Sequence, residues 1–178
     1  MNPVAEGARD QLGRKAADPR PMLAALDEHD VDFLLVGGLA VIARGYSRLT
    51  LDLDILPSPA TRNLARLADA LKGLESVAIG ATGERLPLDL SRPDSLAVGN
   101  YFLETRYGAL DLVNGQRPDL SRYRRLERNA SVLKVSGHEL KVVSKDDLIA
   151  MKREAGRPKD LADIAALTEA ERTGPESH

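Results

Sequence analysis

Two aspartates separated by one residue give the first indication of chemistry in this sequence. Asp52 and Asp54 lie in the stretch TLDLDIL, in which polar and apolar residues alternate. Successive side chains of a β-strand point to opposite faces, so a strand here places both carboxylates on one face, about 7 Å apart. The carboxylates repel each other, and Mg²⁺ removes that repulsion because it prefers oxygen ligands together with substrate phosphates. The spacing indicates a metal and nucleotide site; an ordinary strand with an acidic face is the alternative.

A pair of glycines upstream supports the nucleotide interpretation. Gly37 and Gly38 follow an apolar run at residues 33–36, which predicts a buried strand, and thirteen residues (39–51) separate the pair from Asp52. Glycine lets backbone N–H groups approach an anion closely, and a helix that begins here directs its positive end toward the same place. The backbone of the glycine pair is therefore expected to hold a phosphate.

Residues 32–56 resemble the DNA polymerase β-like nucleotidyltransferases, whose signature is an apolar strand, Gly-Gly or Gly-Ser, a helix and turn, and Asp-x-Asp on the next strand. Within this superfamily the stretch is most similar to the AbiEii/MenT-type toxin nucleotidyltransferases, which also carry Arg-x-Thr/Ser just before Asp-x-Asp. Arg48 and Thr50 fill those places. The resemblance implies an enzyme that transfers NMP from an NTP, such as ATP, to an acceptor hydroxyl. Gly38 stands where many relatives have serine, which leaves the choice of nucleotide open.

A third aspartate lies in the second of two strand-like runs. Residues 101–105 and 109–113 alternate between polar and apolar side chains around a short turn, which predicts an antiparallel pair of strands. In the second run, Asp111 points away from the face that Leu110 and Leu112 share. The resemblance implies that Asp111 is a third metal ligand that orients and deprotonates the attacking hydroxyl. A strand-edge aspartate that faces water is the alternative.

The resemblance assigns the other roles in the site. The carboxylates hold one or two Mg²⁺ ions, and Lys152 contacts the phosphates of the nucleotide from a C-terminal helix. Metal ligands and catalytic carboxylates are Asp52, Asp54 and Asp111, Lys152 is counted as catalytic as well, and the nucleotide-binding residues are Gly37, Gly38, Arg48, Thr50 and Lys152.

The assignment of Lys152 depends on a second block of sequence. The apolar stretch LIAM precedes Lys152, and Arg157, Lys159 and Asp160 follow it, in a pattern that recurs in the toxin-like group. A flexible ammonium group suits phosphate binding. A solvent-facing helical lysine is the alternative. We interpret Arg157 and Asp160 as a structural ion pair or a helix-start device.

Composition and length indicate a globular protein. The chain has 178 residues, of which 43% are hydrophobic and 29% charged, and this suits one domain with a real core. It contains no cysteine, so a disulfide framework or cysteine metal site is excluded. The three histidines share no spacing that suggests a metal or nucleophile role. The N-terminal residues lack the apolar core of a signal peptide, and no stretch approaches a membrane span, so we expect a cytoplasmic protein.

The expected fold is α/β (α+β), with a small mixed β-sheet flanked by helices, as in the minimal nucleotidyltransferase core, and with C-terminal helices. We expect a flexible lead-in at residues 1–18, the nucleotidyltransferase core at 19–143, and a helical extension at 144–172 that packs on the core. Residues 73–100 mix glycines and prolines with short apolar runs, which indicates loops and one short strand. No role is assigned to them.

Charge is distributed unevenly and bears on the acceptor. Residues 115–159 contain twelve Lys and Arg against six Asp and Glu, although the whole chain has a net charge of −2. Part of this excess lies in a predicted helix at 119–128. Its core-facing residues are expected to be Leu120, Tyr123 and Leu126, and its outward arginines Arg122, Arg124, Arg125 and Arg128. Such a helix can hold an RNA backbone, or it can be a solubilising surface.

Three functions remain open from the sequence. The first is the toxin of a toxin–antitoxin pair that adds nucleotides to the 3′ end of tRNA, with a cognate antitoxin protein as a possible partner; the resemblance and the basic segment 115–159 support it. The second is a small-molecule nucleotidyltransferase of the aminoglycoside-modifying kind. The third is a non-catalytic antitoxin or binding module of the same fold, against which the three carboxylates argue.

Overall fold

The structure is a computed structural model of the chain, and it describes residues 17–46, 50 and 52–169. Arg48 and almost all of the expected lead-in at 1–18 lie outside these residues. Among the helices of the described part, none combines the length and the apolar character that crossing a membrane requires.

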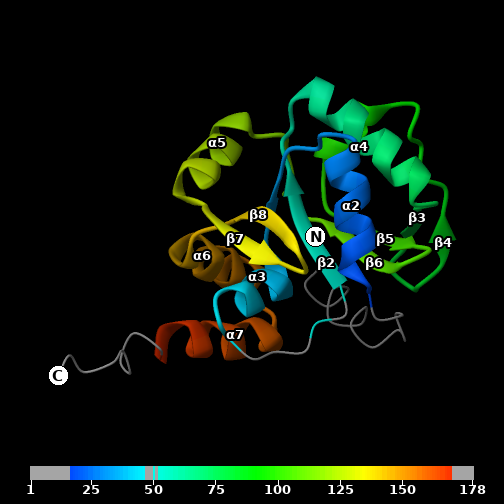
Figure 1. Cartoon of the computed structure of the whole chain (residues 1–178). Helices are drawn as coiled ribbons and strands as arrows, with labels where there is room; N and C mark the ends of the chain where they lie inside the picture. The colour runs from blue at the N-terminus through cyan, green and yellow to red at the C-terminus, as the bar shows by residue number, and fades with distance from the viewer. Residues whose placement is uncertain (1–16, 47–49, 51, 170–178) are drawn as a thin grey trace.

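A mixed β-sheet runs through the described part of the chain (Figure 1). Its eight strands have the order β4-β3-β5-β6-β2-β1-β8-β7. The strands are β1 (Phe33–Leu35), β2 (Asp52–Pro57), β3 (Val77–Ile79), β4 (Arg85–Leu86), β5 (Tyr101–Thr105), β6 (Gly108–Leu112), β7 (Ser131–Val135) and β8 (His138–Val142). Strand β2 is antiparallel to β1 and parallel to β6, and β1 is parallel to β8. The predicted mixed sheet is therefore confirmed.

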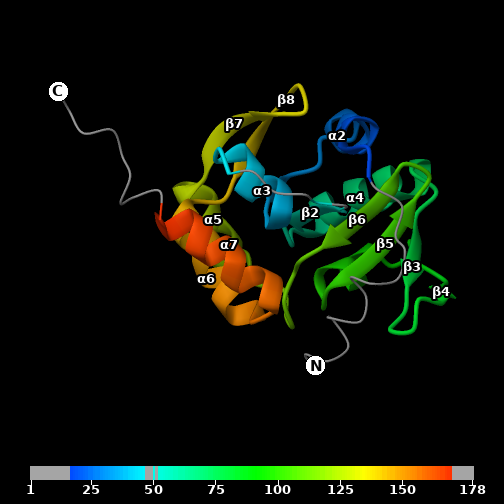
Figure 2. The ribbon, with the colours of Figure 1, turned by 90° about the horizontal axis from the view of Figure 1, so that it is seen from below.

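Helices flank this sheet, as the sequence predicts. They are α2 (Pro19–Glu28), α3 (Gly37–Ala43), α4 (Thr61–Gly73), α5 (Leu120–Asn129), α6 (Lys145–Ala155) and α7 (Pro158–Glu169), together with a short 3₁₀ helix, η1 (Pro93–Ala97). In both views, α5, α6 and α7 gather at the side of the molecule where β7 and β8 lie, and β3 to β6 form the other side (Figures 1 and 2). The α/β fold class is confirmed.

Helix α6 has the ends that its sequence predicts. The Ser144 hydroxyl caps it by accepting a hydrogen bond from the Asp147 backbone N–H at 3.1 Å. At the other end Gly156 adopts a left-handed conformation, with φ of 64°, which an L side chain rarely adopts. Pro158 then opens α7, because proline is tolerated in the first turn. The chain therefore reverses between two helices within three residues, 156–158.

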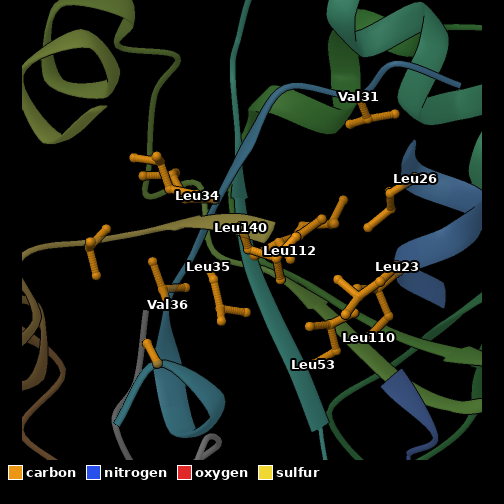
Figure 3. Packing of buried hydrophobic residues seen from close by; sticks show 14 of the residues in the cluster. Leu23, Leu26, Val31, Leu34, Leu35, Val36, Leu53, Leu110, Leu112 and Leu140 are labelled. Atoms are coloured by element: carbon orange, nitrogen blue, oxygen red, sulfur yellow. The ribbon is translucent and has the colours of Figure 1, made fainter. Parts of the chain in front are cut away.

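The core lies behind the strands that carry the aspartates. Leu53 and Ile55 alternate with Asp52 and Asp54 along β2 and are fully buried. Buried residues of α2 pack in the same cluster as the apolar residues of β1, β2 and β6 (Figure 3). Burial of each such leucine or isoleucine contributes about 1.5–3 kcal/mol. The alternation thus holds the apolar side of β2 in the core and leaves the two carboxylates on the other side.

Two expectations about individual segments were wrong. Leu120, expected to face the core, is 38% exposed and is the first residue of α5. Residues 73–100 contain two short strands, β3 and β4, and the helix η1, rather than one strand. Strand β3 pairs with β4 and with the distant strand β5, and the second pairing has no local signal in the sequence.

Candidate functional site

Three carboxylates meet at the centre of the sheet. Asp52 and Asp54 lie on one face of β2, and the parallel register of β2 with β6 places Asp54 directly beside Asp111. One ligand oxygen of each of the three residues lies within 4.8 Å of the others. We call Asp52, Asp54 and Asp111 the carboxylate triad. The structure therefore brings together the three aspartates that the sequence singles out.

Asp111 lies in the interior of the sheet. Its strand β6 is hydrogen-bonded to β5 on one side and to β2 on the other, and its side chain is 4% exposed in a strand that is buried throughout. This position excludes the alternative in which Asp111 is a strand-edge residue that faces water.

The surroundings of Asp54 oppose its ionisation. Desolvation of the Asp54 carboxylate, followed by repulsion from Asp52 and Asp111, raises the pKa of Asp54 to about 8. The Gly38 N–H and the positive charge of Arg157 act in the opposite direction. A divalent cation with oxygen ligands relieves this kind of repulsion, so the donor set of the triad fits Mg²⁺.

The glycine pair packs directly against Asp54. A Cβ on Gly37 would lie only 1.9 Å from Asp54 Oδ2, and the φ of Gly37 is 65°. The Gly38 N–H donates a hydrogen bond to the same Oδ2 at 3.3 Å. Gly37 is therefore required by both its conformation and the close approach of Asp54. Phosphate binding by this backbone stays a prediction.

Thr50 contacts a member of the triad. Its hydroxyl donates a hydrogen bond to Asp52 Oδ1 at 2.9 Å, which orients that carboxylate. A nucleotide contact by Thr50 stays a prediction. The same holds for Arg48, which lies outside the described residues.

A pocket of about 740 Å³ opens beside the triad. It is bounded by the β1–α3 turn, strands β2, β5 and β6, the loops before β5 and after β6, helices α5 and α6, and Arg157 between α6 and α7. Residues that line it include Gly37, Asp54, Asn100, Phe102, Asp111, Gln116, Arg122, Met151, Lys152, Glu154 and Arg157. We call it the central pocket. It combines two members of the triad, Asp54 and Asp111, with apolar and cationic side chains from other elements.

Lys152 has a different environment from the one expected. Its side chain is buried, and its Nζ lies 2.6 Å from Asp163 Oδ2 and 3.4 Å from Asp160 Oδ1. The expected ion pair of Arg157 with Asp160 is present, with Nε 2.7 Å from Oδ2. Burial opposes ionisation of Asp160, but the hydrogen bonds and charges of Arg157 and Lys152 outweigh it and lower its pKa.

The sequence did not identify the two loops at the rim of the pocket. The Asn114 amide donates hydrogen bonds to the carbonyls of Leu96 at 2.7 Å and Gly99 at 2.9 Å. In return, the Asn100 side chain accepts one from the Gly115 N–H at 3.2 Å. These bonds hold Asn100 at the pocket. Partners 15 to 18 residues apart leave no periodic pattern, so no sequence signal points to them.

Sequence comparison adds no identification. No protein-family model matches this chain, and no curated protein matches it.

The fold has clear counterparts among solved structures. The chain is similar to the antibiotic-resistance factor ANT(2″)-Ia, with a TM-score of 0.58 and 16% identity over 85% of this chain and 81% of that one. A crystal structure of ANT(2″)-Ia in complex with adenylyl-2″-tobramycin gives a TM-score of 0.57. The lincosamide antibiotic adenylyltransferase LnuA, bound to lincomycin, has a TM-score of 0.57 and 14% identity, with 86% of this chain and 97% of that chain covered. The described fold is therefore a nucleotidyltransferase fold.

Proposed function

We propose that this protein is a Mg²⁺-dependent nucleotidyltransferase that transfers NMP from an NTP to an acceptor hydroxyl. The observation that carries the proposal is the carboxylate triad, whose ligand oxygens lie within 4.8 Å of one another and two of whose members, Asp54 and Asp111, line a pocket of about 740 Å³. The nucleotidyltransferase fold supports it, because the fold and the triad point to the same chemistry independently.

The proposed reaction assigns a role to each member of the triad. In the transfer, the acceptor oxygen forms a bond to the α-phosphorus while the bond from that phosphorus to pyrophosphate breaks. The hydroxyl proton passes to a carboxylate oxygen of Asp111. Asp52, Asp54 and Asp111 would hold one or two Mg²⁺ ions, which would supply positive charge for the triphosphate and the leaving pyrophosphate. Thr50 keeps Asp52 oriented and Gly38 keeps Asp54 oriented, through the hydrogen bonds already described.

For the acceptor, we propose the 3′ end of tRNA, with the protein acting as the toxin of a toxin–antitoxin pair. The sequence resemblance and the basic helix α5 support this choice. Arg122 lines the central pocket, and Arg124 and Arg128 are exposed on the same helix. Arginines at the rim of a catalytic pocket attract the phosphates of an RNA strand and bind them with a marked dependence on salt.

A small-molecule acceptor is the second candidate. One solved structure of ANT(2″)-Ia holds adenylyl-2″-tobramycin, and the structure of LnuA holds lincomycin. The volume of the central pocket, about 740 Å³, lies within the range of about 300–1,000 Å³ that is typical of small-molecule sites. The two candidates share the proposed chemistry and differ in the acceptor alone.

The test is transfer of label from each α-labelled NTP, with Mg²⁺, to total tRNA or to a panel of antibiotics. We expect Asp54→Asn to lower the rate about 100-fold or more, because it removes a preorganised charge. Asp69→Asn, an exposed aspartate on α4, is the matched control and should leave the rate unchanged. Label on tRNA supports the first candidate and label on a drug the second. No transfer by the folded protein to any acceptor would overturn the proposal and favour the binding module.

A further inference from the structure

The α6–α7 hairpin brings a cluster of four charged residues to the central pocket. Lys152 and Arg157 line the pocket together with Asp54 and Asp111 of the triad. Behind them, Asp160 and Asp163 are buried. We call Lys152, Arg157, Asp160 and Asp163 the hairpin cluster. It contains two cations and two anions, so its formal charges balance.

Within the hairpin cluster, the ammonium group of Lys152 forms ion pairs with two buried aspartates. Its side chain is 5% exposed, and its Nζ contacts both Asp163 at 2.6 Å and Asp160 at 3.4 Å. Removing one partner from a buried ion pair is strongly unfavourable, because the other charge stays buried. Movement of Lys152 toward a phosphate would likewise take this cation away from the buried carboxylates of Asp160 and Asp163.

Arg157 is the more exposed cation of the hairpin cluster. Its side chain is 26% exposed and faces the pocket. Asp160 holds one edge of the guanidinium, with Nε 2.7 Å from Oδ2 and Nη2 3.3 Å from Oδ1. A guanidinium carries five N–H donors in a planar fork, so a group held along one edge by a carboxylate can bind a phosphate along another.

These contacts form a chain from the core of the hairpin to the pocket. Lys152 donates a hydrogen bond to Asp160. Asp160 in turn accepts hydrogen bonds from the side chain of Arg157 and, at 3.3 Å, from its backbone N–H. The geometry therefore separates two tasks: a buried lysine that sets the position of a carboxylate, and an arginine that the carboxylate presents to the pocket.

We infer that Arg157 binds the triphosphate of the nucleotide and that Lys152 is a positioning residue that acts on Arg157 through Asp160. This inference rests on the proposed nucleotidyl transfer. It replaces the direct phosphate contact expected of Lys152 and adds a substrate-binding role to an arginine interpreted as structural.

The first test is direct binding of an NTP, with Mg²⁺ and without acceptor. Arg157→Gln should weaken the NTP affinity about 10- to 100-fold, because charge-assisted hydrogen bonds are lost. Arg157→Lys should restore only part of the affinity, since an ammonium lacks the fork. Arg153→Gln, an exposed charge on α6, is the matched control and should bind as the wild type does. Thermal unfolding of each variant shows that the fold is kept.

The second test is a double-mutant cycle between Lys152→Met and Arg157→Gln. If Lys152 acts through Arg157, Lys152→Met weakens NTP binding in the wild type but has little further effect once Arg157 is Gln. Full additivity would instead show that Lys152 binds the phosphate itself. If Lys152→Met does not fold, Lys152→Met/Asp163→Leu takes its place, because it removes the buried pair as a whole.

The outcomes separate this inference from the proposed function. A wild-type protein that binds none of the NTPs overturns both. A wild type that binds an NTP, together with an Arg157→Gln variant of equal affinity, overturns the role of Arg157 alone and leaves the proposed function standing.

Discussion

The ionisation of Asp54 links the stability of the protein to its metal site. Its carboxylate shares a face with Asp52, lies beside Asp111 in the register, and accepts a hydrogen bond from the Gly38 N–H. Its pKa is raised to about 8 by desolvation and by the other two carboxylates. Without a cation, the folded protein therefore keeps a proton on Asp54 at a pH where the unfolded chain has released it.

Residue-scale linkage predicts how stability changes with pH. The pKa of Asp54 lies near 3.8 in the unfolded chain and about 8 in the folded one, so its contribution is fully present below about pH 3.8 and is lost as the pH rises through about 8. Between these values the free energy of unfolding should fall by up to about 1.4 kcal/mol per pH unit from this residue. Urea unfolding from pH 5 to 8 in EDTA, compared with Asp54→Asn, measures the difference.

Magnesium provides the control for this prediction. A cation that binds the ionised triad stabilises the folded protein, and it competes with the proton on Asp54. The increase in melting temperature on adding Mg²⁺ should therefore grow from pH 6 to pH 8 and be small in Asp54→Asn. Equal stabilisation of both proteins at every pH would contradict the assignment of Asp54 as a ligand.

At the scale of elements, the turn between β1 and α3 determines where Asp54 can lie. In Gly37→Ala the new Cβ would lie 1.9 Å from Asp54 Oδ2, so the carboxylate or the turn must move. We expect a loss of about 1–3 kcal/mol in stability from the strained backbone and clash, together with a large fall in Mg²⁺ affinity and transfer. Unfolding and Mg²⁺ titration measure the two effects.

Gly45 offers a matched control for this turn. It has a φ of 89°, but a Cβ there would meet nothing within 4 Å. Gly45→Ala should therefore show the cost of backbone strain with no effect on Mg²⁺ affinity. If both variants lose Mg²⁺ affinity equally, contact between Gly37 and Asp54 is not the cause.

The junction of α5 and α6 gives a second prediction at this scale. Asp147 accepts hydrogen bonds from Ser144 Oγ at 2.6 Å, Arg125 Nη1 at 2.7 Å and Asn129 Nδ2 at 3.0 Å. Burial opposes its ionisation, but these donors outweigh burial and lower its pKa, so its contribution is present above about pH 3.8 and is lost as the pH falls. Asp147→Ala should reduce the free energy of unfolding by about 2–3 kcal/mol at pH 7.

Asp146 is the control for Asp147. It lies in the same first turn of α6 and is exposed, so Asp146→Ala should remove only its interaction with the helix dipole, about 0.3–1 kcal/mol. Urea unfolding of the two variants at pH 7 compares them. Equal losses would show that the hydrogen bonds of Asp147 do not join the two helices.

At the scale of the whole molecule, one continuous core supports the site from behind. Leu23 of α2 is 1% exposed and packs in this core, away from the central pocket (Figure 3). Leu23→Ala should lower the free energy of unfolding by about 2–5 kcal/mol through lost burial and a residual cavity. The transfer rate should be unchanged at temperatures where the variant is folded.

Leu161→Ala is the matched control for Leu23→Ala, because it makes the same substitution at an exposed position. Leu161 of α7 is 65% exposed, so its loss should change the stability by about 0.5 kcal/mol or less. Calorimetry of both variants, with transfer measured well below the melting temperature, checks the prediction. A slower transfer in folded Leu23→Ala would show that the core also determines the geometry of the triad.

Much of the fold and part of the site could be predicted because they follow from local periodicity. Alternation along residues 52–56 places Asp52 and Asp54 on one face, whichever strands pair with this one. The glycine pair after a buried strand predicts a turn at that point of the chain. Helix α6 has its own cap at Ser144 and its own stop at Gly156. Each of these signals is contained within a few residues of sequence.

The tertiary structure decided what depends on distant partners. The register of β2 with β6 brought Asp111 beside Asp54. The hydrogen bonds of Asn114 to the η1 loop brought Asn100 to the pocket. The reversal between α6 and α7 buried Lys152 among aspartates and left Arg157 in the lining of the pocket. A side chain's charge and reach are properties of the sequence. Whether its charge is used by a substrate or by a buried partner depends on which groups surround it, and only the packed chain determines that.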